Sequence, residues 1–198
     1  MATNLRELLI QRAARLQERP ALSTPGWGTL SYAQFRNRVE GVARGLLAQV
    51  PPPKVVGCAT GTPWDWIAEV ATAASGLVWD PAGATLPPET LGGGLFNAEA
   101  GRGPYHEQEK QIRETTPFLV GLTQTQHLAR LSVLNRRLGW DHETRVCLPL
   151  ARLAEPPVRN ALWSALYAGA HVVLEQPSTG TSWEEPLFLG CGSSAERL

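Results

Sequence analysis

The sequence of 198 residues predicts an α/β fold, with a parallel or mixed sheet flanked by helices. Short apolar runs of strand length alternate with longer segments in which apolar residues recur at helical spacing. A strand at residues 55–59, a helix at 63–75 and a strand at 77–79 follow one another through short turns. This order is typical of a right-handed βαβ unit, whose two strands are parallel.

The length and the apolar content predict one domain. A hydrophobic fraction of 43% is enough for a sizeable core in a chain of this size. We expect a single α/β domain at residues 1–176, with a loop-rich segment at 82–114 that has little regular pattern. Residues 177–198 are rich in Gly, Ser and Thr and are expected to form a peripheral or flexible tail.

Two helices are predicted in the N-terminal part, at residues 4–18 and 32–47, from apolar residues at helical spacing. Ser31 and Gln34 have the spacing of a capping box, in which each side chain bonds the other's backbone amide. Thr62 is expected to cap the helix that follows it.

The regular pattern returns after the loop-rich segment. A strand at 116–120 runs through a short turn into an amphipathic helix, and a strand at 145–149, a helix at 156–168 and a strand at 172–174 follow. The apolar face of the amphipathic helix is expected to carry Leu128, Leu131, Leu134 and Leu138.

Charge and composition exclude several classes of function. The formal net charge is zero, so no broad basic field attracts nucleic acid or anionic lipid. No apolar run approaches membrane-spanning length and no signal-peptide core is present, which favours a cytoplasmic protein. Cys58, Cys147 and Cys191 are odd in number and widely spaced, so reduced thiols are expected rather than a disulfide framework or a zinc site.

Three blocks of residues carry a family resemblance through their order along the chain. The blocks are Arg19-Pro-Ala-Leu22 with Gly28-Thr-Leu-Ser-Tyr32, then Lys54-Val-Val-Gly-Cys-Ala59 with Trp64-Asp-Trp66 and Ala73-Ala-Ser-Gly76, and finally Leu148-Pro-Leu150 with Tyr167-Ala-Gly-Ala-His-Val-Val-Leu174. Together they resemble the N-terminal region of an adenylate-forming enzyme of the acyl-CoA synthetase (AMP-binding) type. The resemblance implies that family's α/β fold.

The departures from the family pattern concern the catalytic parts. In the family, a Ser/Thr/Gly-rich loop ending in Pro-Lys-Gly lies between such a strand and such a helix and grips ATP phosphates. Here residues 118–127 contain one glycine and no lysine, and the whole chain has only Lys54 and Lys110. Each missing donor to a developing phosphate charge is worth roughly 10²–10³-fold in rate. The sequence therefore predicts no catalytic residue, no cofactor and no metal site.

The leading hypothesis is a truncated, non-catalytic acyl-CoA synthetase-like protein that acts through self-association or a protein partner. One alternative is an acyl- or aryl-acid ligase that is active only with a partner chain. Another is a binder of a small carboxylic acid that retains the pocket and not the chemistry. Neither nucleic acid nor a membrane is an expected partner.

Four residues are weak candidates for substrate binding. Thr123 and Thr125 lie at the start of the amphipathic helix, where their amides could bind a small anion, although helix capping alone explains them. His127 occupies about the place of a histidine that follows the phosphate loop in the family; the alternative is an ordinary helix-face histidine. Arg152 follows Leu148-Pro-Leu150, near the family's acyl pocket, and is either a carboxylate partner or a solvated loop arginine.

Overall fold

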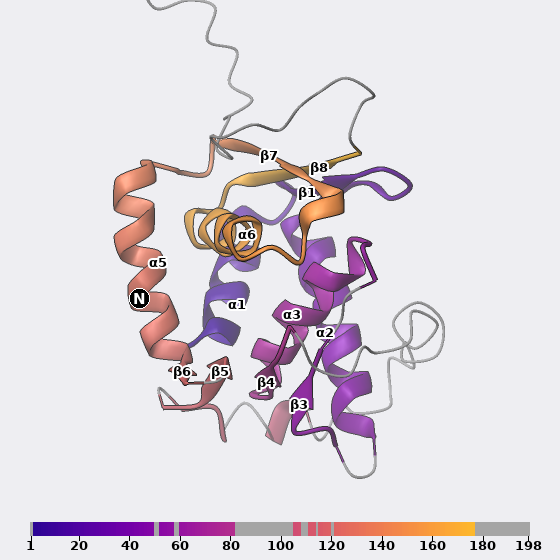
Figure 1. Ribbon diagram of the computed structural model, residues 1–198, viewed down its shortest axis with the longest axis vertical. Helices are drawn as coiled ribbons and strands as arrows, with labels where there is room; N and C mark the ends of the chain where they lie inside the picture. Colours follow the sequence, from indigo (N-terminus) through magenta and orange to yellow (C-terminus); the bar gives the residue numbers. More distant parts are fainter. Residues whose placement is uncertain are drawn as a thin grey trace, which may run out of the picture.

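The computed structural model describes residues 2–49, 52–57, 60–81, 105–107, 111–113, 115–119 and 121–176. Its strands form two four-stranded sheets at opposite ends of a layer of helices (Figure 1). Each sheet contains both parallel and antiparallel pairs. The predicted α/β class with a mixed sheet is therefore confirmed, with the strands divided between two small sheets.

The first sheet joins the two ends of the described chain. Its strands, in spatial order, are β2 (Gly28–Ser31), β1 (Pro20–Thr24), β8 (His171–Glu175) and β7 (Arg145–Pro149). β8 is parallel to both β1 and β7, and β1 pairs with β2 as an antiparallel hairpin. Leu22 pairs with Val172, so residues 150 positions apart share one sheet.

The second sheet contains the predicted βαβ unit. Its order is β3 (Val55–Val56), β4 (Val78–Trp79), β5 (Pro117–Leu119) and β6 (Leu122–Thr123). β3 and β4 are parallel and are connected by α3 (Trp64–Ala74), as the sequence predicts. β5 continues the parallel arrangement, whereas β6 is antiparallel to β5.

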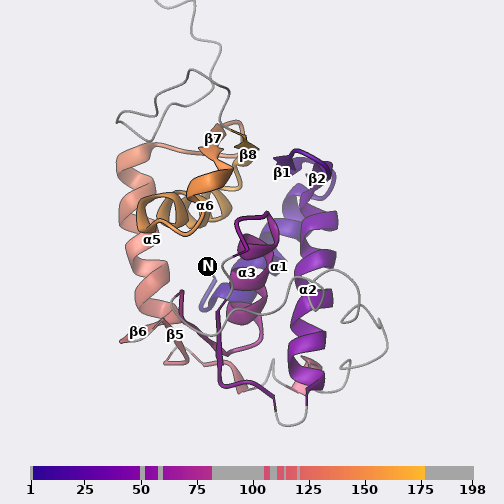
Figure 2. The same ribbon diagram turned by 45° about the vertical axis from the view of Figure 1, so that its right-hand side comes forward.

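The remaining helices are α1 (Leu5–Leu16), α2 (Tyr32–Ala48), α5 (Gln124–Leu138) and α6 (Pro156–Ala168), with the short 3₁₀ turn η2 (Leu150–Arg152) before α6. Figure 2 shows α1 and α3 in the middle, with α2 on one side and α5 and α6 on the other. The largest fully buried side chains include Trp163, Tyr32 and Phe118. The hydroxyl of Tyr32 donates to the carbonyl of Ala170 at 2.7 Å, which ties the start of α2 to the first sheet.

The two predicted helix caps have different outcomes. Ser31 and Gln34 form the expected capping box at the start of α2. Thr62 does not cap α3: Pro63 occupies that position and makes no side-chain cap bond. The carboxylate of Asp65 instead accepts hydrogen bonds from the amides of Thr60 (2.8 Å) and Gly61 (2.9 Å), because a first-turn carboxylate can reach back to the preceding loop.

Several further expectations can be compared with the structure. Cys147 is disulfide-bonded, which corrects the expectation of reduced thiols. Within the described residues, no three metal-ligating side chains are grouped to hold an ion, and no helix is long and apolar enough to cross a membrane. The loop-rich segment 82–114 is described only in part, where Tyr105 and Ile112 are buried. The tail at 177–198 lies outside the described residues.

Candidate functional site

The junction between β5 and α5 is a tight hairpin. Leu119 pairs with Leu122, so only two residues separate β5 from β6, and α5 begins at once after β6. One of the two is Gly121, whose φ of +75° lies in the left-handed region that glycine adopts without strain. The short turn predicted between strand and helix is confirmed.

The start of α5 is closed by its own side chains. The Thr123 hydroxyl accepts from the Gln126 amide at 3.2 Å, and the Gln126 side-chain oxygen accepts from the Thr123 amide at 2.9 Å. This capping box satisfies two backbone donors that an anion would otherwise use. The exposed Thr125 hydroxyl donates to the carbonyl of Thr3 at 3.2 Å. Both threonines therefore have structural partners in the helix start.

Gln124, the first residue of α5, is fully buried and connects three helices. Its side-chain nitrogen donates to the Ala73 carbonyl at 2.9 Å, at the end of α3. Its side-chain oxygen accepts from the Leu5 amide, also at 2.9 Å, at the start of α1. The two groups that bond Gln124, the Leu5 amide and the Ala73 carbonyl, lie far from it in the sequence, so no local pattern predicts this role.

His127 is buried against aromatic rings. Its relative exposure is 5%, and its ring centroid lies 5.0 Å from that of Phe118 and 5.3 Å from that of Trp163. Burial lowers the pKa of His127 to about 4, and the positive charges of Arg130 and Arg159 act in the same direction. The ring is therefore neutral at neutral pH. Its Nε2 atom has no hydrogen-bond partner among the described residues.

His127 lines a groove with a volume of about 520 Å³ between α5, α6 and the β5–β6 hairpin. We call it the α5 groove; its lining includes Leu119, Leu122, His127, Arg130, Leu131, Val133, Leu134, Arg137 and Asn160. No carboxylate is among the described residues that line it. Leu134 was predicted as a core residue but is only half-buried here, and Val133 is 45% exposed.

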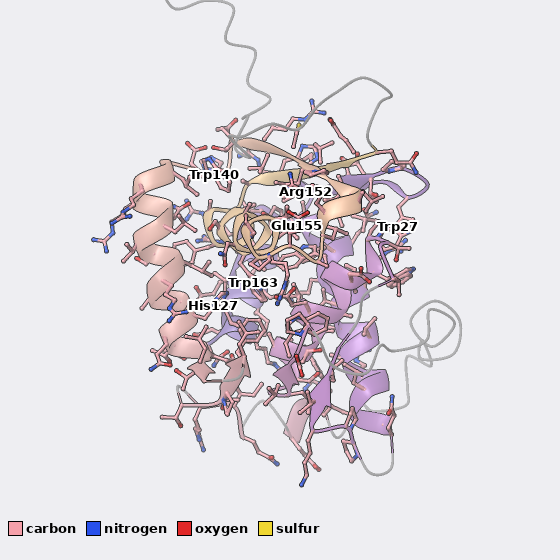
Figure 3. The ribbon with its side chains drawn as sticks, viewed as in Figure 1. Trp27, His127, Trp140, Arg152, Glu155 and Trp163 are labelled. Atoms are coloured by element: carbon pink, nitrogen blue, oxygen red, sulfur yellow. The ribbon has the colours of Figure 1, made fainter. Side chains whose placement is uncertain are left out.

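Arg152 lies elsewhere. Its Nε donates to Glu155 at 2.7 Å across the turn between η2 and α6. This hydrogen bond from Arg152 lowers the pKa of the Glu155 carboxyl. Figure 3 shows Arg152 and Glu155 together, away from His127. The structure therefore does not gather the four candidates: Thr123 caps α5, Thr125 bonds the Thr3 carbonyl, His127 lines the α5 groove, and Arg152 has a local partner.

Comparison with known proteins rests on structure alone. No family model and no curated protein matches the sequence. Among solved structures, the N-terminal domain of FACL13 from Mycobacterium tuberculosis superposes with a TM-score of 0.63 at 14% identity, over 90% of this chain and 58% of that chain. The N-terminal subdomain of Klebsiella oxytoca NpsA, solved in complex with 3-hydroxyanthranilyl-AMSN, gives 0.58 at 18% identity, over 88% and 54%. VinN gives 0.63 at 12% identity, over 86% and 56%.

The fold is that of the N-terminal region of adenylate-forming enzymes. The chain spans between 46% and 61% of the length of the solved chains it matches. The resemblance inferred from three blocks of residues is thereby shown at the level of the fold.

In an open α/β sheet, ligands commonly bind outside the carboxyl ends of the strands. The cavity between the end of β4, in the second sheet, and the turn that follows β7, in the first sheet, is small. The cavity beside Trp79 and Leu153 measures about 10 Å³, the room of one water molecule. Glu69 occupies its wall and accepts from Arg159 at 2.9 and 2.6 Å and from the indole of Trp163 at 2.8 Å. The ion pair of Glu69 and Arg159 was not predicted from the sequence, in which the two residues are 90 positions apart.

Proposed function

We propose that this chain is a non-catalytic, acyl-CoA synthetase-like protein that acts by contact with another protein chain, either a second copy or a different partner. The observation that carries the proposal is the β5–α5 junction. There, a two-residue turn and a closed capping box stand where the family has its phosphate loop.

The argument against adenylation is electrostatic. Transfer of a carboxylate to the α-phosphate of ATP develops charge on phosphate oxygens, which backbone amides, a lysine and Mg²⁺ hold in this family. Residues 118–127 offer neither lysine nor arginine. The Thr123 and Gln126 side chains already occupy two amides of the helix start. A site lacking several such donors loses roughly 10²–10³-fold in rate for each.

The α5 groove supports action through a protein contact. Val133 is one of only two large hydrophobic side chains that are exposed among the described residues, and it lines this groove. Exposed apolar side chains next to a groove are typical of recognition surfaces.

A cytoplasmic location is also part of the proposal. The disulfide at Cys147 argues against that location, because disulfides persist mainly in oxidising compartments.

The decisive experiment is calorimetric titration with ATP–Mg²⁺ of protein whose mass in solution has been measured. We expect no heat of binding and no ATP-dependent pyrophosphate exchange across a panel of carboxylic acids. Exchange by the chain alone, or only after a second chain is added, would establish the ligase alternative instead.

Two further measurements separate the remaining alternatives. Saturable binding of a fatty or aromatic acid without ATP would favour the carboxylic-acid binder. A strictly monomeric mass together with no specific protein partner would remove the basis for action through protein contact.

A further inference from the structure

One face of α5 combines an apolar floor with a basic rim. His127, Arg130, Leu131, Leu134 and Arg137 recur at helical spacing and all line the α5 groove. Leu131 is buried, whereas Arg130 and Arg137 are exposed. Figures 1 and 2 both place α5 at the edge of the molecule.

The basic rim is not neutralised within the described part of the chain. The arginines that form ion pairs there are Arg19, Arg36, Arg44, Arg152 and Arg159. Arg130 and Arg137 form none with a described carboxylate, and the described residues that line the groove include no acidic side chain. The His127 ring is neutral and adds no charge. The complementary ligand is therefore anionic as well as apolar.

The positive charge of the groove rim also favours some kinds of partner over others. In a symmetric dimer the same patch meets itself, so packing through the α5 groove would bring the rim arginines of two copies together. Like charges facing each other across an interface oppose that arrangement. A small ligand is commonly enclosed over 70–90% of its surface. Val133, which lines this groove, is an apolar side chain with 45% exposure, and a partner larger than a small ligand would cover it.

We propose that the α5 groove docks an acidic amphipathic helix of another protein. Its apolar residues, at helical spacing, would cover Leu122, Val133 and Leu134, and its flanking carboxylates would pair with Arg130 and Arg137. The inference rests on the proposed function, since it names the surface and the chemistry of the partner through which the chain acts.

The test uses the full chain and a synthetic helical peptide of about 15 residues, built from Leu, Ala and Glu with leucines on one face. A peptide with Lys in place of every Glu serves as the ligand control. Binding is measured by fluorescence anisotropy at about 0.15 M salt, where the Debye length is about 8 Å. We expect the acidic peptide to bind saturably and the basic peptide not to bind.

Arg137→Glu and Arg136→Glu form a matched pair of variants. Both residues are exposed in the last turn of α5, but only Arg137 lines the groove. We expect Arg137→Glu to weaken acidic-peptide binding by about tenfold or more, and Arg136→Glu by less than about threefold, because a contact pair contributes more than a screened distant charge. Val133→Glu is expected to weaken binding similarly to Arg137→Glu.

Several outcomes would overturn the inference. These are no saturation by the acidic peptide, equal effects of the two arginine variants, competition by octanoate at the groove, or a change in solution mass on Arg137→Glu that reveals self-association there. ATP–Mg²⁺ binding would instead contradict the proposed function. A genuine protein partner that is insensitive to Arg137→Glu would reject the groove and leave the proposed function intact.

Discussion

The polar groups on the two sides of Trp163 differ in whether they have hydrogen-bond partners. On one side its indole donates to Glu69, which also holds Arg159 in a two-point ion pair, so the charges are matched in the interior. On the other side its ring packs against His127, whose Nε2 has no partner among the described residues. The first region is complete within the chain and serves stability. The second leaves a buried ring nitrogen without a partner among the described residues, which costs stability.

The largest effect that tests this comparison is expected from Glu69→Ala. Removing the carboxylate leaves Arg159 without its charge partner and the indole of Trp163 without an acceptor, in an environment where Glu69 is 3% exposed. We expect a loss of about 3–5 kcal/mol in the free energy of unfolding, measured by urea denaturation.

Glu143→Ala is the matched control, since the Arg19–Glu143 pair is exposed, with side-chain exposures of 43% and 67%. Its expected cost is about 0–1 kcal/mol because water and salt screen such a pair. Similar costs for both variants would mean that the interior network does not stabilise the fold as argued.

Gln124→Ala ranks second. It removes two buried hydrogen bonds and leaves the Leu5 amide without its partner, whereas the Ala73 carbonyl still accepts from the Gly76 amide at 3.1 Å. The expected cost is about 2–4 kcal/mol in thermal or urea unfolding. Gln126→Ala, two residues away, removes an exposed capping partner and should cost about 1 kcal/mol or less. Equal losses would show that the bridge between helices contributes little.

The third prediction concerns pH and His127. The unfolded chain binds this proton near pH 6.5, whereas burial lowers the folded pKa to about 4. The unfolded state therefore takes up more protons as the pH falls through this window, and stability decreases from pH 6.5 to pH 4 by on the order of 3 kcal/mol. The measurement is urea unfolding at several pH values, with the imidazole titration followed by NMR.

His127→Phe is the comparison variant for this effect. Phenylalanine keeps an aromatic ring between Phe118 and Trp163 and removes the titrating group. We expect it to be within about 1.5 kcal/mol of the parent at neutral pH and to lose less stability on acidification. Identical pH dependence of the two proteins would show that His127 is not responsible.

Hydrogen bonds between residues close together in the sequence were predicted, whereas those between residues far apart in the sequence were not. The capping box of Ser31 and Gln34 was predicted because both residues lie within one helical turn. The bonds of Gln124 were not, because their partners lie 51 and 119 residues away. The pair of Glu69 and Arg159 depends on α3 meeting α6, which no local spacing encodes.

The candidate site shows the same division. The short turn before α5 was predicted, because the sequence between the strand and the helix lacks the phosphate loop of the family it resembles. The α5 groove was not, since Leu134 has the spacing of a core residue and only the packing of the hairpin and α6 leaves it half-exposed. Arg130 and Arg137 share a helical face with His127, a pattern that was visible in the sequence but equally typical of a solvated helix.

The smallest effect is expected at the helix start, and it concerns the junction that carries the proposed function. Thr123→Ala removes the acceptor for the Gln126 amide and should cost about 1 kcal/mol. Thr125→Ala removes only an exposed hydrogen bond to Thr3 and should cost less. Inorganic phosphate raises stability only if it binds the folded state. Because the cap already occupies two amide donors at the start of α5, phosphate should not shift the unfolding midpoint of the parent. A phosphate-dependent shift in the parent would mean that the junction still binds an anion.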